Sequence, residues 1–279
     1  MKLSEAFEYS LSFLNEHGID EADFKALCLV CSLADIKNSQ FEFLKNSDFD
    51  FSALDEKLRL LADGDPLQYV LGKWDFYESE FSVGRGVLIP RPETEELTEL
   101  AIRFAKAINN PVVYDLCAGS GCIGISIAKA IPQARVYCVE KSAEAIKYLN
   151  NNIQLANNAF AIEGDVLSPT SLLNTLPKAD IIVSNPPYIK SSAISWLQPE
   201  VQREPAMALD GGEDGLDFYR TIVNNFSTAL KDNGIILFEI GEEQGESVAE
   251  ILKNAGFSDV EIIKDIYGNV RIAKAIKNK

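Results

Sequence analysis

From about residue 111 to its end, the chain alternates short apolar runs with longer stretches that carry apolar residues at helical spacing. The runs predict strands near 112–116, 135–139, 159–163, 180–184, 234–240, 259–265 and 269–276. The stretches predict helices near 122–131, 142–155, 216–231 and 242–255. Such alternation is typical of a parallel sheet covered by helices. Because only Tyr267-Gly268-Asn269 joins the last two strands, we expect that pair to be antiparallel.

Four residues follow successive predicted strands at the point where each strand ends. Gly119, Glu140, Asp165 and Asn185 come after the runs at 112–116, 135–139, 159–163 and 180–184. The carboxyl ends of parallel strands meet at one edge of a sheet, and open α/β sheets bind their ligands at this edge. We therefore expect these four residues to converge on one site.

The first of these strand ends carries a glycine motif. Gly119, Gly121 and Gly124 form G-x-G-x-x-G between a strand and a helix, so the backbone can approach a ligand and the helix offers unpaired N–H groups. Glu140 follows the first motif glycine by 21 positions, where a carboxylate can accept hydrogen bonds from two ribose hydroxyls. The pattern predicts a cofactor that bears adenosine, and both NAD and S-adenosylmethionine fit it.

The fourth strand end carries the peptide Asn185-Pro186-Pro187-Tyr188. The two prolines remove two N–H donors and fix two φ angles, which stiffens the segment. The Asn185 amide oxygen and the Pro186 carbonyl can then accept both hydrogens of a planar –NH2 group, with the Tyr188 ring packed on its plane. Hydride transfer needs no such grip, so the peptide favours methyl transfer to an amide or amino nitrogen. A purely structural strand-end turn is the alternative.

Charge and composition restrict the partners. The chain has 42 acidic and 26 basic residues, a net charge of −16, and no basic patch of the kind that phosphate binding requires. We expect no direct nucleic-acid substrate, and the acidic charge either favours a basic or neutral protein partner or serves only solubility. No apolar run reaches the length of a membrane span and no signal peptide is evident, so we expect a cytoplasmic protein without membrane contact. No heptad pattern or apolar patch indicates a dimer, so we expect a monomer.

The first quarter of the chain differs from the rest. Apolar residues recur at helical spacing up to about residue 70, and residues 1–75 hold 15 acidic and 7 basic side chains. We expect a helical domain over 1–72, which serves either as a docking surface or as a structural cap. Residues 73–90 predict a β-hairpin linker with turns at Gly84 and Gly86, and residues 91–279 form the catalytic domain. Thr94 or Glu95 is expected to cap the helix that follows.

Three further sequence blocks carry a family resemblance. They are Gly64-Asp65-Pro66-Leu67-Gln68-Tyr69-Val70-Leu71-Gly72, Leu88-Ile89-Pro90-Arg91-Pro92-Glu93-Thr94-Glu95 and the stretch from Glu204 to Tyr219. With the glycine motif and the Asn-Pro-Pro-Tyr peptide, they make the chain resemble the peptide chain release factor N5-glutamine methyltransferase family along its whole length. The resemblance implies an α/β fold with a seven-stranded Rossmann-like S-adenosylmethionine methyltransferase sheet. That sheet is mostly parallel with an antiparallel last strand, and it follows a small N-terminal helical domain for release-factor docking.

The resemblance also implies an activity. The family transfers a methyl group from S-adenosyl-L-methionine to the side-chain amide nitrogen (N5) of the glutamine in the Gly-Gly-Gln motif of class I release factors. The product is S-adenosyl-L-homocysteine, and the modification modulates translation termination. An N6-adenine methyltransferase acting on DNA or RNA, in which the peptide would grip the adenine amino group, is the alternative. A cofactor-binding protein without activity is a third interpretation.

Carried over position by position, the resemblance assigns the site residues. Cofactor binding falls to Cys117, Ala118, Gly119, Ser120, Gly121, Glu140, Asp165, Val166 and Asn185. Substrate binding falls to Asn185, Pro186, Pro187 and Tyr188, of which Asn185 and Tyr188 are catalytic, and no metal is involved. The chain departs from the family pattern twice. Cys117 begins the turn where many relatives have glycine, and Val166 stands where some relatives have an aromatic residue that stacks on adenine.

Overall fold

The computed structural model describes residues 1–279, and the chain divides into two compact units. One unit holds Met1–Lys73 together with Gln198–Arg203, and the other holds Trp74–Leu197 and Glu204–Lys279. No feature of the sequence predicts that residues 198–203 belong with the N-terminal helices. None of the helices is both long and apolar enough to cross a membrane.

The first unit is helical. Its elements are α1 (Leu3–Glu16), α2 (Ala22–Leu33), the one-turn η1 (Asn38–Gln40), α3 (Phe41–Leu44), α4 (Leu54–Ala62) and α5 (Leu67–Leu71). Two polar contacts join residues 198–203 to these helices. The buried Lys25 ammonium of α2 pairs with Glu200 at 2.6 Å, and the Arg203 guanidinium donates to the Asp63 carbonyl at 2.6 Å. Removing a partner from a buried charge is costly, so the Lys25–Glu200 pair fixes where this segment lies.

A hairpin follows, but its turn is not where the glycines predict it. Strands β1 (Lys73–Phe76) and β2 (Ser79–Ser82) are joined at Tyr77-Glu78, and Tyr77 has φ +54°. The Tyr77 N–H donates to the Glu95 carboxylate at 2.8 Å, a tertiary bond that supports this left-handed residue. Gly84 and Gly86 come after β2, where a Cβ on either would overlap side chains of α8 (Ala143–Asn152). They permit the loop to lie close to that helix.

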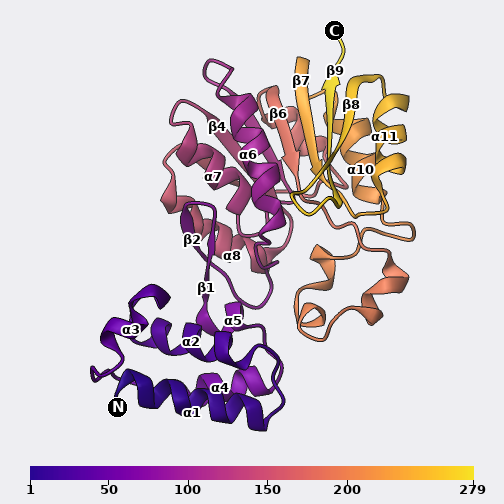
Figure 1. Ribbon diagram of the computed structural model, residues 1–279. Coiled ribbons are helices and arrows are strands. Elements are labelled where there is room, and N and C mark those ends of the chain that lie inside the picture. The colour runs from indigo at the N-terminus through magenta and orange to yellow at the C-terminus, as the bar shows by residue number, and fades with distance from the viewer. The chain divides into compact units, whose positions relative to one another are not determined.

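The second unit contains one seven-stranded sheet in the order β5-β4-β3-β6-β7-β9-β8 (Figure 1). The strands are β3 (Val112–Leu116), β4 (Arg135–Glu140), β5 (Ala159–Glu163), β6 (Ala179–Ser184), β7 (Leu230–Glu239), β8 (Phe257–Lys264) and β9 (Val270–Lys277). The five strands β3 to β7 are parallel, whereas β9 runs antiparallel to both β7 and β8. The predicted fold class is confirmed, including the antiparallel last pair.

Helices cover both faces of this sheet (Figure 1). On one face lie α6 (Glu93–Ala105), α7 (Cys122–Ala130) and α8, and on the other lie α9 (Thr170–Thr175), α10 (Asp217–Thr221) and α11 (Gly245–Asn254). Strand β3 shows why its run is apolar at every position except Asp115. Val113 belongs to the core of the first face, whereas Val112 and Tyr114 belong to the core of the second. A strand covered on both sides is therefore apolar at most of its positions.

Two local predictions are wrong. The helix expected over 216–231 ends early, because α10 gives way to a π-helical turn at Ile222–Phe226 and β7 already begins at Leu230, beside Ala179 of β6. Thr94 and Glu95 do not cap α6, whose cap position is Pro92 and which has no side-chain cap bond. Both side chains bond to residues distant in sequence instead.

Candidate active site

A pocket opens at the carboxyl ends of the strands from β5 to β6. The four residues expected to converge, Gly119, Glu140, Asp165 and Asn185, all line it. The pocket encloses about 890 Å³ between its walls, its open mouth included, which lies in the range of cofactor sites. Its walls come entirely from the second unit.

The glycine turn after β3 forms the floor of this pocket. Cys117, Gly119 and Gly121 all have left-handed backbone, with φ of +61°, +56° and +82°. Cys117 therefore takes a conformation that costs a residue with a Cβ about 1–2 kcal/mol and that glycine adopts freely. At Gly119 the nearest atom to the place that a Cβ would take is a Val87 methyl at 3.8 Å, so a ligand can approach this backbone closely. At Gly121 a Cβ would overlap Leu149, so this glycine serves the packing of the turn.

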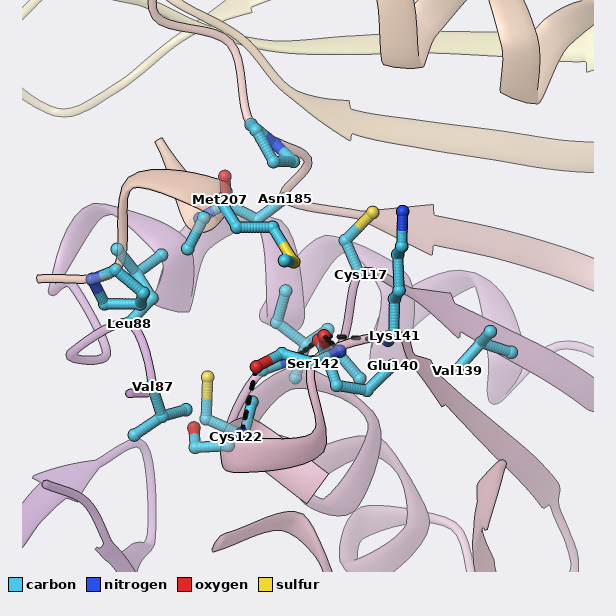
Figure 2. A pocket seen from close by; sticks show the side chains of 18 of the residues that line it. Val87, Leu88, Cys117, Cys122, Val139, Glu140, Lys141, Ser142, Asn185 and Met207 are labelled. Atoms are coloured by element: carbon cyan, nitrogen blue, oxygen red, sulfur yellow. Dashed lines mark hydrogen bonds between the residues drawn. The ribbon is translucent and has the colours of Figure 1, made fainter. Parts of the chain in front are cut away.

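Glu140, at the end of β4, holds the turn in place. Its Oε2 accepts the Gly119 N–H at 2.8 Å, and its Oε1 accepts the N–H groups of Lys141 and Ser142 at 2.8 and 2.7 Å (Figure 2). One lone pair on Oε2 remains for a ligand hydroxyl. On the neighbouring loop, Asp165 pairs with Lys141 at 2.9 Å, and Val166 is buried in the pocket wall.

Asp115 lies beside this turn and is fully buried. Its Oδ2 accepts the Gly124 N–H at 2.8 Å, whereas Oδ1 has no hydrogen-bond partner. Burial raises the pKa of Asp115 to about 7, against the opposing effect of the Gly124 N–H, and the nearby Glu140 charge raises it further. Asp115 itself does not line the pocket, so it supports the turn from behind.

The Asn-Pro-Pro-Tyr peptide reaches the pocket with only some of its residues. Asn185 and Pro187 line it, whereas Pro186 and Tyr188 do not. The Tyr188 hydroxyl lies 3.5 Å from Glu239 Oε1, and the side chain packs against the core of the second sheet face. Burial, together with the Glu239 charge, raises the pKa of Tyr188 to about 12, so the hydroxyl keeps its proton at neutral pH. The lining does not support packing of the Tyr188 ring on a substrate amide.

Asn185 is held from behind by residues that the sequence analysis missed. Its Nδ2 donates to Thr94 Oγ1 at 3.2 Å, and Thr94 Oγ1 donates to Glu239 Oε2 at 2.5 Å. Glu239 is the last residue of β7, the strand next to β6. An acidic residue that ends the apolar run Ile235–Phe238 was the signal available in the sequence, since this strand end meets the others at the same edge.

The remaining wall comes from two of the sequence blocks to which no role was assigned. The lining includes residues 86–91 and Pro205, Met207 and Ala208, and Figure 2 shows Leu88 and Met207 on the same side as Asn185. The buried Glu204 joins the two segments, because it accepts the Ile89 N–H at 2.9 Å and pairs with the Arg91 guanidinium. This ion pair gives the apolar wall a fixed position.

The glycines of the block from Glu204 to Tyr219 support the bracket formed by Asn185, Pro186, Pro187 and Tyr188. A Cβ on Gly211 would lie 2.8 Å from the Pro187 carbonyl oxygen, and a Cβ on Gly215 would overlap the Tyr188 carbonyl oxygen. Only glycine allows this loop to lie directly against the bracket. The Gln244 amide then ties both together, donating to the carbonyls of Tyr188 and Gly215 at 2.9 and 3.1 Å.

Comparison with known proteins identifies the family. The methyltransferase small domain model matches residues 97–202. The release factor glutamine methyltransferase of Thermodesulfovibrio yellowstonii is 43% identical over 223 residues, which cover 77% of each chain. That of Bacillus cereus is 36% identical over 285 residues, 99% of each chain.

Among solved structures, a precorrin-6y C5,15-methyltransferase from Geobacter metallireducens shares the fold. It aligns with a TM-score of 0.50 at 16% identity, over 71% of this chain and 94% of that one. The predicted family is confirmed by the sequence relatives: the chain belongs to the release factor glutamine methyltransferase family.

Proposed function

We propose that the protein methylates the side-chain amide nitrogen (N5) of the glutamine in the Gly-Gly-Gln motif of class I release factors, with S-adenosyl-L-methionine as methyl donor. Family membership supports the reaction class. The single observation that carries the assignment is the position of Asn185, an oriented amide at the wall of a pocket whose floor is a glycine turn.

The residues of the pocket fit the donor. Gly119 offers backbone with open space before it, Glu140 retains one acceptor position for a ribose hydroxyl, and Asp165 and Val166 provide a carboxylate and an apolar surface for adenine. When bound, S-adenosyl-L-methionine supplies an electrophilic methyl group on a sulfonium, and S-adenosyl-L-homocysteine is left after transfer. Val166 gives less stacking than an aromatic residue, so we expect adenine to be held mainly by enclosure.

The Asn185–Tyr188 bracket acts on the methyl acceptor, which is the glutamine amide. The nitrogen of a carboxamide is a poor nucleophile, because its lone pair is delocalised into the carbonyl. Asn185 Oδ1 accepts an N–H of the glutamine amide, which fixes the direction of its nitrogen, whereas Pro186 does not line the pocket. Positioning of this kind can contribute up to about 7–11 kcal/mol to lowering a barrier. Tyr188 stays protonated and is no base, so the amide proton leaves to solvent after transfer.

The protein partner engages more than the pocket. We propose that the helical unit docks the release factor, since residues 1–75 carry an excess of acidic side chains, 15 against 7 basic ones. We also propose that the protein acts as a monomer, because one chain supplies every wall of the pocket.

The test is mass spectrometry of the Gly-Gly-Gln peptide after incubation of release factor with the enzyme and methyl-labelled donor. A parallel reaction offers DNA and RNA, and label there instead of on glutamine would support the adenine alternative. Asn185→Ala should lower kcat about 100-fold while changing donor affinity little, because the lost contact orients the acceptor. An unchanged kcat would refute the role of Asn185.

A further inference from the structure

Behind Asn185 lies a chain of hydrogen bonds whose members are buried. Thr94, in the first turn of α6, and Glu239, at the end of β7, are each 2% exposed. The chain runs from Asn185 Nδ2 to Thr94 Oγ1 at 3.2 Å, and from Thr94 Oγ1 to Glu239 Oε2 at 2.5 Å. The other carboxylate oxygen, Oε1, accepts the Tyr188 hydroxyl at 3.5 Å. Both oxygens of Glu239 thus act as acceptors.

This chain has a direction that chemistry imposes. A threonine hydroxyl has one hydrogen to donate, and here it goes to Glu239, an acceptor-only group when ionised. Thr94 Oγ1 can therefore offer only lone pairs to Asn185, so the amide must turn its NH2 group toward Thr94. The two ends of an asparagine amide have nearly the same shape, and the partners of the amide decide which end points where.

We propose that Thr94 and Glu239 are positioning residues for methyl transfer: Glu239 orients the Thr94 hydroxyl, and the hydroxyl orients the Asn185 amide so that its oxygen meets the substrate N–H. This inference rests on the proposed function, because an acceptor at this point is needed only for an incoming –NH2 group. Without the carboxylate, the Thr94 hydrogen is free to bond Asn185 Oδ1. The Asn185 amide would then turn its NH2 group toward the –NH2 group of the substrate, and two hydrogen-bond donors would face each other.

The experiment compares two buried threonines of α6. Thr94→Val removes the orienting hydroxyl with little change of shape. Thr98→Val removes an equally buried hydroxyl one turn later, which donates only to the Thr94 carbonyl at 3.0 Å. Thr94→Ser restores the hydroxyl at the first position. For each variant, kcat and KM with release factor, the Kd of S-adenosyl-L-methionine by calorimetry, and the thermal midpoint are measured.

Thr94→Val should lower kcat at least about tenfold, and up to about 100-fold, with donor Kd within about threefold of wild type. Thr94→Ser and Thr98→Val should keep kcat within about threefold. A merely structural hydroxyl would lower the thermal midpoint in both valine variants and leave their kcat values alike, and that result overturns the proposal. If Thr94→Val does not fold, Thr94→Ala removes the same hydroxyl and is judged by the same criterion.

The wild-type enzyme distinguishes the proposed activity from the positioning role of Thr94. Wild-type enzyme that leaves the release factor unmodified contradicts the proposed function itself. Wild-type enzyme that methylates it, with Asn185→Ala impaired and Thr94→Val as active as Thr98→Val, contradicts only the positioning role.

Discussion

At the scale of the single residue, Asp115 combines full burial with an oxygen that has no hydrogen-bond partner. Burial raises its pKa to about 7, above the value of about 3.9 for an aspartate in an unfolded chain. The folded state therefore binds more protons than the unfolded state between about pH 4 and pH 7. The free energy of unfolding should fall as pH rises through this window and remain low above it.

Asp115→Asn should remove this dependence. An asparagine keeps an acceptor for the Gly124 N–H and carries no charge to bury. Urea unfolding at pH 5 and pH 8 should show wild type losing about 2 kcal/mol more than the variant over this interval. Burial also raises the pKa of Glu239, but that residue is present in both proteins, so its effect cancels in the comparison. Equal losses in the two proteins would contradict the assignment.

At the scale of elements, the loop that contains Gly215 decides where the Asn185–Tyr188 bracket lies. Gly215 has φ +78°, and an added Cβ would overlap the Tyr188 carbonyl oxygen and lie 2.8 Å from Gln244 Nε2. Gly256, in the turn between α11 and β8, has a similar φ of +84° but no atom within 4 Å of an added Cβ. The two positions share backbone strain and differ in crowding.

Gly256→Ala should therefore cost about 1–2 kcal/mol in the free energy of unfolding and leave kcat unchanged. Gly215→Ala should cost about 1–3 kcal/mol beyond that and lower kcat, because the displaced loop moves the bracket. Both quantities are measured on the two variants side by side. A Gly215→Ala enzyme with wild-type kcat would show that the bracket holds its position without this loop.

The elements also show what sequence alone predicts. The runs of β3 and β6 are mostly apolar because both faces of the sheet are covered, and this pattern can be recognised from the local sequence. The convergence of Glu140 and Asn185 followed from it, since parallel strands end at one edge.

The errors arose where distant contacts override local pattern. The hairpin turns at Tyr77, a left-handed non-glycine supported by Glu95, so Gly84 and Gly86 were the wrong signals. Thr94 resembled a cap, but its hydroxyl bonds Glu239, which lies 145 positions away. No spacing rule encodes such a bond. The sequence therefore predicted Asn185 as a site residue but not Thr94 and Glu239, which hold its side chain.

At the scale of the whole molecule, net charge acts on a protein substrate at longer range than any contact. The net charge is −16, and the helical part has 15 acidic against 7 basic side chains in residues 1–75. Fields between exposed charges act over about 8–10 Å at physiological salt and weaken as salt rises. Attraction of a basic partner should therefore raise its association rate at low ionic strength.

The docking proposal predicts where this attraction originates. The value of kcat/KM with release factor should fall as ionic strength rises, while the affinity for S-adenosyl-L-methionine changes less. Neutralising three exposed acids of the helical unit, with Glu8→Gln, Asp20→Asn and Asp23→Asn together, should lower kcat/KM at low salt and flatten its salt dependence. kcat should stay unchanged, since none of the three lines the pocket.

The matched control removes the same number of exposed charges from the catalytic unit. Asp232→Asn, Glu250→Gln and Asp259→Asn lie on β7, α11 and β8, and none of them lines the pocket. If the helical unit docks the release factor, only the first triple variant flattens the salt dependence. If both variants flatten it equally, the net charge of the molecule attracts the partner and the helices have no special part. A salt dependence unaltered in either variant would place the docking surface away from these charges altogether.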